Sequence, residues 1–214
     1  SKKGSQQSQT KMPSIQRLTI GSCLRTSEQM REGRDEMKVA MLGGSFDPVH
    51  LGHLFLLHCA VSMSDYDTFI VVPAALSNFK RTNAPKATDN DRLEMLRLAL
   101  LDYKDIYPQD CDADIRLSTM ELDRGGVSYT YDTVMDLKRD MDIHGRLGLI
   151  MGDDQIPSLA RWYRFDDLKR EVRFLVCRRN QDGALWTLMP EGVVYSKIEP
   201  SGLAPQSSSG FRAD

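Results

Sequence analysis

Residues 43–54 read Gly-Gly-Ser-Phe-Asp-Pro-Val-His-Leu-Gly-His-Leu and decide the fold, because they join an apolar strand to an apolar helix. The strand is predicted over Met37–Leu42 and the helix over Leu51–Met63. Glycines let the backbone approach a ligand closely, and the exposed N–H groups and dipole of a helix N-terminus favour an anion. His50 and His53 add side-chain donors, so this segment predicts a site for a phosphate chain. A strand–turn–helix corner with two structural histidines is the alternative.

Length and composition favour one globular domain. The chain has 214 residues, of which 41% are hydrophobic and 27% charged, and its net charge is −2. This charge gives no overall basic field for nucleic acid or an anionic membrane surface. No apolar stretch reaches the roughly 20 residues of a membrane span, and no apolar secretory core is present. We therefore expect a cytoplasmic protein with neither nucleic acid nor a membrane as partner.

Short apolar strands alternate with helical patterns along the rest of the chain. Helices are expected after the capping box that begins at Thr88, over Tyr129–Met141, and up to Arg170. Further strands are predicted over Thr68–Val72, Asp114–Glu121, Leu147–Met151, Arg173–Cys177 and Val193–Ile198. This alternation predicts a single α/β domain with a Rossmann-like, doubly wound and mainly parallel sheet. Its ligands are expected beyond the carboxyl ends of the strands.

Polar groups follow several of these strands. His50 and His53 follow the first strand, Lys80 the second, and Gly152-Asp153-Asp154 the strand over Leu147–Met151. All of these groups therefore fall at the same edge of the sheet. A Gly-Asp segment there admits a ligand and offers a carboxylate to ribose hydroxyls, although a helix N-cap by either aspartate is the alternative.

The segment Gly43–Leu54 resembles the signature of the nucleotidyltransferase superfamily whose hallmark is (His/Thr)-x-Gly-His. Later segments narrow the resemblance to the bacterial nicotinate mononucleotide adenylyltransferases, and it runs from about Met37 to Arg212. The resemblance implies that ATP and nicotinate mononucleotide give deamido-NAD and pyrophosphate, a step of NAD biosynthesis. His50 and His53 would contact the phosphate chain, with Mg²⁺ bound mainly through ATP.

The resemblance also implies further phosphate contacts. Ser207-Ser-Ser-Gly-Phe-Arg212 is similar to the family's Ser-Ser-Thr-x-Ile-Arg, so Ser208, Ser209 and Arg212 would hold the terminal phosphates, with Arg212 in the catalytic set. Taken alone, such a serine-rich tail is usually disordered. Phe79-Lys80 is similar to the family's Pro-His-Lys, which makes Lys80 a phosphate-neutralising candidate; a solvated lysine is the alternative. The ATP site predicted in this way also contains Gly44, Ser45, Phe46, Gly152 and Asp154.

Two segments resemble the family's pyridine-binding side. Ser128-Tyr-Thr-Tyr-Asp-Thr133 is similar to Ser-Tyr-Thr-x-Asp-Thr at the start of a helix, and Arg161-Trp-Tyr163 to a Trp-Tyr loop. An indole can stack on a pyridine ring, and helix-start amides can hold a carboxylate. Thr130, Tyr131 and Trp162 are therefore predicted around the nicotinate. Without the resemblance, Trp162 is more often a packing residue.

The resembling enzymes begin at a methionine that corresponds to Met37. Residues 1–36 are therefore expected to be an extension, flexible or a non-native leader, ahead of a nucleotidyltransferase domain over 37–214. A genuine N-terminal arm, with Leu18–Leu24 packed on the domain, is the competing hypothesis. The family's further C-terminal helix is expected to be missing, because the sequence stops at Asp214.

Other functions stay open at this point. The acceptor of the same chemistry could be phosphopantetheine or glycerol phosphate, or the chain could be a non-catalytic nucleotide-binding module. No protein metal site is predicted, because no carboxylate or cysteine completes a zinc set with His50, His53 and His58 at a recognisable spacing. A homo-oligomer is compatible with the sequence.

Overall fold

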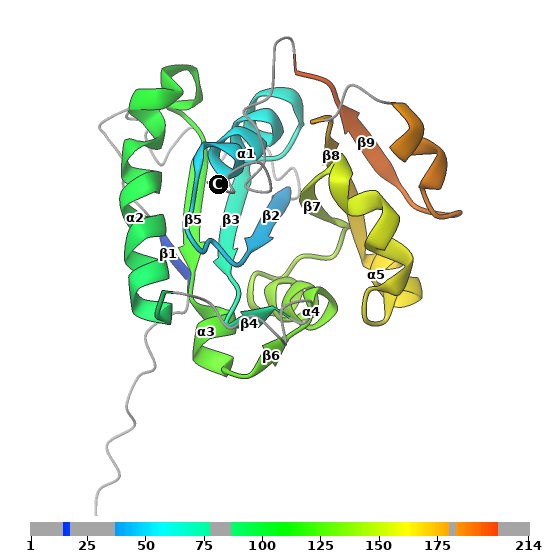
Figure 1. Cartoon of the computed structure of the whole chain (residues 1–214), viewed down its shortest axis with the longest axis horizontal. Helices are drawn as coiled ribbons and strands as arrows, with labels where there is room; N and C mark the ends of the chain where they lie inside the picture. Colours follow the sequence, from blue (N-terminus) through cyan, green and yellow to red (C-terminus); the bar gives the residue numbers. More distant parts are fainter. Residues whose placement is uncertain (1–14, 18–36, 78–86, 180–182, 201–214) are drawn as a thin grey trace, which may run out of the picture.

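The computed structural model describes residues 15–17, 37–77, 87–179 and 183–200, which form one α/β unit (Figure 1). Its main sheet has seven strands in the order β1-β5-β3-β2-β7-β8-β9. The six strands from β5 to β9 in this order are parallel, and β1 is antiparallel to β5. The predicted Rossmann-like, doubly wound fold class is therefore confirmed.

The elements follow the predicted order closely. The strands of the main sheet are β1 (Ile15–Arg17), β2 (Val39–Gly44), β3 (Thr68–Pro73), β5 (Asp114–Ser118), β7 (Leu147–Gly152), β8 (Val172–Cys177) and β9 (Tyr195–Ile198). The helices are α1 (Leu51–Met63), α2 (Asp89–Ile106), α3 (Met120–Arg124), α4 (Thr130–Asp140) and α5 (Phe165–Glu171), with 3-10 turns η2 (Pro108–Asp110), η3 (Asp153–Arg161) and η4 (Gly183–Leu188). Two short strands, β4 (Leu76–Ser77) and β6 (Val127–Ser128), pair in a small second sheet that the sequence did not predict.

The sheet is covered on both faces, which explains why its strands read as apolar runs. Alternate residues of β2 serve the two faces: Ala40 and Leu42 pack in the core cluster that contains the buried residues of α1 and α2. Val39 and Met41 pack in a second cluster, with α4 and α5. Figure 1 shows α1 and α2 on one side of the strands and α4 and α5 on the other. This arrangement leaves the carboxyl ends of the strands as the edge open to a ligand.

One strand is shorter than predicted. The strand expected over Asp114–Glu121 ends at Ser118, and α3 begins at Met120. The Ser118 hydroxyl accepts a hydrogen bond from the Met120 N–H (3.3 Å), and this local bond competes with the sheet ladder and turns the chain. Glu121 therefore lies in a helix, buried against α4.

The N-terminal stretch is described only at β1, where Ile15 pairs with Ser118 of β5. Residues 18–24, which the competing hypothesis places against the domain, lie outside the described residues, so the division at Met37 stays a prediction. In the described ranges, no helix is long and apolar enough to cross a bilayer.

Candidate functional site

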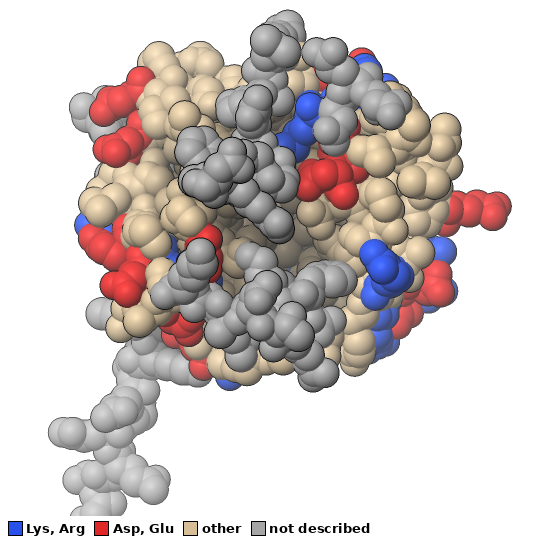
Figure 2. Space-filling model, in the orientation of Figure 1, with Lys and Arg blue, Asp and Glu red and all other residues tan. Residues whose placement is uncertain are grey.

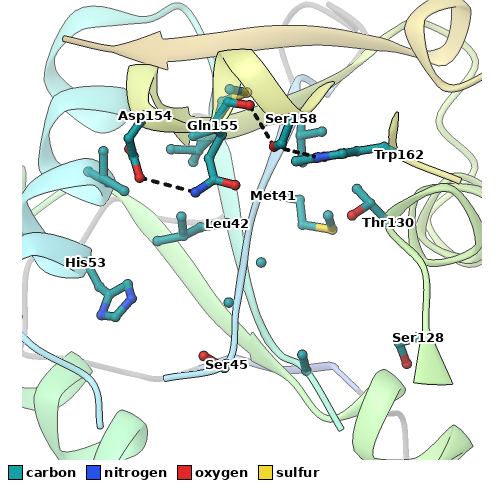
Figure 3. Close-up of a pocket in the computed structure, with 18 of the residues that line it drawn as sticks. Met41, Leu42, Ser45, His53, Ser128, Thr130, Asp154, Gln155, Ser158 and Trp162 are labelled. Atoms are coloured by element: carbon teal, nitrogen blue, oxygen red, sulfur yellow. Dashed lines mark hydrogen bonds between the residues drawn. The ribbon is translucent and has the colours of Figure 1, made fainter. Parts of the chain in front are cut away.

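A cavity of about 560 Å³ opens at the carboxyl ends of β2 and β7. Its walls include Gly43, Gly44 and Ser45 of the glycine-rich turn, His53 of α1, and Asp154 of η3. Figure 3 shows the His53 ring on one side of the cavity, with Trp162, Thr130 and Ser128 on the opposite side. In the space-filling view, the molecule is hollowed near the centre of the face shown, and acidic and basic side chains are interspersed around its rim (Figure 2).

The two histidines of the glycine-rich segment lie against each other at the start of α1. Their ring centroids are 3.8 Å apart. His50 is the N-cap: its Nδ1 accepts from the Gly52 N–H (3.1 Å), while His53 Nδ1 accepts from the His50 N–H (3.3 Å). A backbone N–H can only donate, so in both rings Nδ1 is the unprotonated nitrogen and Nε2 carries the hydrogen. The helix cap therefore sets both rings as Nε2–H donors, which suits a phosphate ligand.

The charge state of His50 agrees with this arrangement. Partial burial lowers the pKa of His50 from its usual 6.5, and the positive charge of Arg179 lowers this pKa further. The ring is thus kept neutral at neutral pH, as its role as a hydrogen-bond acceptor requires.

Arg179 follows β8 and reaches the same cavity. Its Nη1 lies 3.6 Å from Asp154 Oδ1, and its side chain is 12% exposed. Its Nη2 is buried and has no hydrogen-bond partner among the described residues. A guanidinium cannot lose its charge, so Arg179 brings a fixed positive charge to the cavity wall.

Two glycines make room for this arginine. A Cβ on Gly52 would lie 3.0 Å from Arg179 Nη2 and 3.0 Å from the His50 ring. A Cβ on Gly152 would lie 2.7 Å from Arg179 Cδ and 2.3 Å from Asp154 Oδ1. The glycine between the two histidines therefore leaves the space that the His50 ring and the Arg179 guanidinium occupy.

The two aspartates after β7 have different surroundings. Asp153 is fully buried, and its Oδ1 accepts from the Arg179 N–H (3.2 Å). Asp154 lines the cavity, and its Oδ2 accepts from the Gln155 side chain (3.2 Å; Figure 3). Neither side chain caps η3, whose N-cap is Gly152 without a side-chain hydrogen bond. The N-cap alternative for these aspartates is therefore not observed.

Aromatic side chains form the wall opposite His53. The Trp162 indole donates from Nε1 to Ser158 Oγ (3.2 Å), which holds the ring at the cavity (Figure 3). Tyr129 and Tyr163 also line it, and their ring centroids are 4.3 Å apart. Thr130 begins α4, so the helix N-terminus faces the cavity on this side. This half of the site can stack on a flat ring and bind a negative group.

The structure brings seven of the ten predicted site residues that it describes to the cavity wall, namely Gly44, Ser45, His53, Thr130, Gly152, Asp154 and Trp162. His50 does not line the cavity, although its ring lies against the His53 ring. Phe46 lies behind the wall: it is fully buried and its ring meets the His53 ring edge-on, with centroids 4.8 Å apart. Tyr131 does not line the cavity. Its ring instead packs against the Arg164 guanidinium, whose Cζ lies 4.2 Å from the ring centroid. Four further predicted residues, Lys80, Ser208, Ser209 and Arg212, lie outside the described residues.

Several wall residues were missed from the sequence. Arg179 could have been found, because it follows a predicted strand at the same edge as the other polar groups. Glu121, which also lines the cavity, was misplaced by the overlong strand prediction. Its pKa is raised by burial, and it accepts a hydrogen bond from the Thr133 hydroxyl (2.6 Å). Tyr129 lies within the quoted segment, but the sequence does not show which of two neighbouring tyrosines faces inward.

Paired imidazoles on a glycine-rich turn, at the carboxyl edge of a doubly wound parallel sheet, define a nucleotidyltransferase type of site. A family model described as Cytidylyltransferase-like matches residues 41–209, and the chain belongs to this family. Among its relatives, it belongs with the nicotinate-nucleotide adenylyltransferases, so the family resemblance found in the sequence is confirmed.

Two relatives illustrate this membership. A probable nicotinate-nucleotide adenylyltransferase of Treponema pallidum is 37% identical over 145 residues, which are 67% of this chain and 66% of the relative. The matched region thus spans just under two thirds of that relative's length. A probable nicotinate-nucleotide adenylyltransferase of Exiguobacterium sibiricum is 33% identical over 163 residues, which are 76% of this chain and 78% of the relative.

Solved structures show the same fold. Plasmodium falciparum nicotinic acid mononucleotide adenylyltransferase complexed with NaAD has a TM-score of 0.62 and 20% identity, over 78% of this chain and 76% of that one. The same enzyme complexed with APC has a TM-score of 0.60 and 18% identity, with the same coverage of both chains.

Proposed function

We propose that this protein transfers the adenylyl group of ATP to nicotinate mononucleotide, giving deamido-NAD and pyrophosphate in NAD biosynthesis. The observation that carries the proposal is the two-sided cavity, with imidazole and guanidinium donors on one side and Trp162 beside a helix N-terminus on the other. The relatives described as nicotinate-nucleotide adenylyltransferases support the same activity.

The chemistry needs little from the protein besides position and charge. A 5′-phosphate oxygen of the mononucleotide attacks the α-phosphorus of ATP, and the bond from that phosphorus to the pyrophosphate oxygen breaks. The attacking phosphate is already an anion and pyrophosphate is a good leaving group, so no general base or covalent intermediate is required. The work of catalysis is then to align the two phosphates and to stabilise the developing charge.

Each side of the cavity has a part in this reaction. His50 and His53 donate from Nε2 to the phosphate chain near the α-phosphorus, and Arg179 adds a fixed positive charge. Asp154 accepts hydrogen bonds from ribose hydroxyls. The predicted contacts of Lys80, Ser208, Ser209 and Arg212 with the phosphates remain part of the proposal, because these residues lie outside the described ones.

The pyridine ring is assigned to the aromatic wall. Trp162 stacks on the ring, and the first amides of α4, at Thr130 and Tyr131, hold the nicotinate carboxylate. The side chain that frames the ring is then that of Tyr129, the residue before α4, in place of Tyr131, because Tyr129 lines the cavity.

Mg²⁺ is proposed as the metal, bound mainly through ATP. The donor set fits this role: Asp154 is the aspartate on the wall and already faces Arg179, and the described ranges hold no group of three or more metal-binding side chains. When bound, the ion neutralises phosphate charge, and the residues of the chain orient the phosphates around it.

Pyrophosphate release in a coupled assay tests the function. With ATP and Mg²⁺, we expect release that depends on nicotinate mononucleotide, with less from nicotinamide mononucleotide. Release only with phosphopantetheine or glycerol phosphate would move the chain to another branch of the family. Nucleotide binding with no release from any of these acceptors would make it a binding module.

A cytoplasmic location, a homo-oligomer and the absence of nucleic-acid and membrane partners also remain proposals. Cell fractionation tests the location, and light scattering of the purified protein tests the assembly.

A further inference from the structure

A buried arginine lies behind the phosphate side of the cavity. Arg92 of α2 is fully buried. Its Nη1 donates to the backbone carbonyls of Ser45 (2.6 Å) and Ala74 (2.7 Å), and its Nη2 to that of Ala75 (3.3 Å). Nη2 also pairs with Asp89 Oδ1, one helical turn earlier (2.5 Å). One side chain thus joins α2, the glycine-rich turn and the segment after β3.

Two of these carbonyls belong to residues that line the cavity. Ser45 and Ala74 are on its wall, whereas Arg92 is not. Carbonyl oxygens carry partial negative charge and would repel a phosphate if they faced it. Because Arg92 binds both oxygens, they are directed to the guanidinium behind the wall.

The same contact orients a peptide N–H. The C=O and N–H of a trans peptide point in opposite directions, and the peptide between Ser45 and Phe46 is trans. With the Ser45 carbonyl bound to Arg92, the Phe46 N–H is directed away from the guanidinium. Phe46 has a positive φ of 44°, a backbone conformation that a non-glycine residue adopts only when its surroundings impose it.

The charge of Arg92 is only partly balanced. Among the described residues, its carboxylate partner is Asp89, whose side chain is 54% exposed, whereas the guanidinium itself is fully buried. Water screens the exposed carboxylate more effectively than the buried cation. A positive potential therefore remains on the turn, where the triphosphate is proposed to bind.

We propose that Arg92 is a positioning residue for ATP: it holds the Ser45 turn in its anion-binding form and supplies positive potential from behind the wall. This inference rests on the proposed function only in taking the ligand to be a nucleoside triphosphate. A purely structural role, fastening α2 to the sheet, is the alternative.

Matched variants on α2 separate the two roles. Arg92→Lys keeps a charge but loses the planar fork that reaches three carbonyls, and Arg92→Ala removes both. Arg97→Ala is the control. Arg97 also lies on α2 and pairs with a carboxylate three residues before it, Glu94, but its side chain is exposed. Titration calorimetry gives the Kd of ATP·Mg²⁺, and steady-state assays give the KM of each substrate.

For Arg92→Lys, we expect the Kd and KM of ATP to rise roughly tenfold or more, with the KM of the acceptor changed less than twofold. Arg97→Ala should match the wild type. Addition of guanidinium at millimolar concentration should restore ATP binding to Arg92→Ala, and ammonium should not. An ATP affinity within twofold of the wild type in folded Arg92→Lys, or equal losses for both substrates, would overturn the proposal.

Asp89→Asn gives a second measurement that does not depend on the folding of Arg92 variants. It removes the compensating charge, so we expect a lower Tm together with equal or tighter ATP binding. Weaker ATP binding in this variant would support the structural role and contradict ours. Calorimetry of ATP binding needs no acceptor. A wild-type protein that binds ATP but does not turn over nicotinate mononucleotide would therefore refute the proposed function, while the comparison of ATP affinities would still test the role of Arg92.

Discussion

Arg179 Nη1 lies 3.6 Å from Asp154 Oδ1, which joins the residues that follow two neighbouring parallel strands, β7 and β8. The arginine is the more buried partner, at 12% exposure of its side chain against 40% for the aspartate. Arg179 thus pairs with Asp154 through Nη1, and its Nη2 is buried without a hydrogen-bond partner among the described residues.

Arg179→Ala should raise the KM of ATP roughly tenfold or more, because a buried charged donor to the nucleotide is lost. Arg178→Ala is the matched control: the neighbouring arginine pairs with Glu199 and is 36% exposed, so its loss should leave kinetics within twofold. Equal effects of the two variants on the KM of ATP would contradict a contact between Arg179 and the nucleotide.

His53→Ala should lower kcat roughly a hundredfold, which corresponds to about 3 kcal/mol of transition-state stabilisation. His53→Gln should retain part of this rate, because the Gln amide nitrogen can take the place of Nε2. His144→Ala serves as the control, since that imidazole is 77% exposed. Turnover of His53→Ala close to that of the wild type would exclude the assigned role.

His50 should make stability depend on pH. Its pKa is lowered in the folded state, by burial first and by Arg179 second. As pH falls below about 6.5, the unfolded chain takes up a proton that folded His50 does not, so the free energy of unfolding should fall. His50→Asn keeps an N-cap acceptor and removes this titration. Urea unfolding between pH 5 and 8 should show a shallower acid decline for the variant; parallel curves would contradict the expectation.

Glu121 should have the opposite dependence. Burial raises the pKa of Glu121 in the folded state above the value of 4.5 for the free side chain. As pH rises above 4.5, Glu121 loses its proton in the unfolded chain before it does so in the folded protein. The free energy of unfolding should therefore fall as pH rises. Glu121→Gln should therefore gain stability over the wild type as pH increases, since it keeps the acceptor for the Thr133 hydroxyl. Glu121→Ala should lose about 1–3 kcal/mol, because that buried hydroxyl is left without its carboxylate partner. Thermal unfolding at several pH values measures both effects.

Trp162→Ala should raise the KM of nicotinate mononucleotide roughly tenfold and leave the KM of ATP nearly unchanged, because only the stacking surface is lost. Trp162→Phe should recover part of the affinity. Trp186→Phe is the control, since Trp186 does not line the cavity. An equal rise for both substrates would place Trp162 outside a distinct pyridine subsite.

Periodicity and caps predict the backbone of this fold well. The apolar runs of β2, over 39–42, and of β3 are buried on both faces, and the Thr88 capping box forms as its sequence indicates. The histidine pair was predicted because a short segment carries both its residues and its helix start. These features are local, so a linear sequence displays them.

Long-range side-chain geometry was not predictable in the same way. The contact of Arg92 with Ser45 crosses 47 positions, and the approach of Arg179 to Gly52 depends on how α1 packs beside β8. Tyr129 and Tyr131 are both plausible cavity residues in the sequence. The start of α4 at Thr130 decides between them, through a one-residue detail that pattern alone does not fix.

The antiparallel strand β1 has a consequence for any shortened form of this protein. It occupies the free backbone of β5 with only three residues, Ile15–Arg17. A chain that begins at Met37 would keep the described residues that line the cavity but present an unpaired five-residue strand at the edge of its sheet. Unpaired edge strands of this kind can pair with strands of other molecules. The shortened chain would therefore have a greater tendency to self-associate.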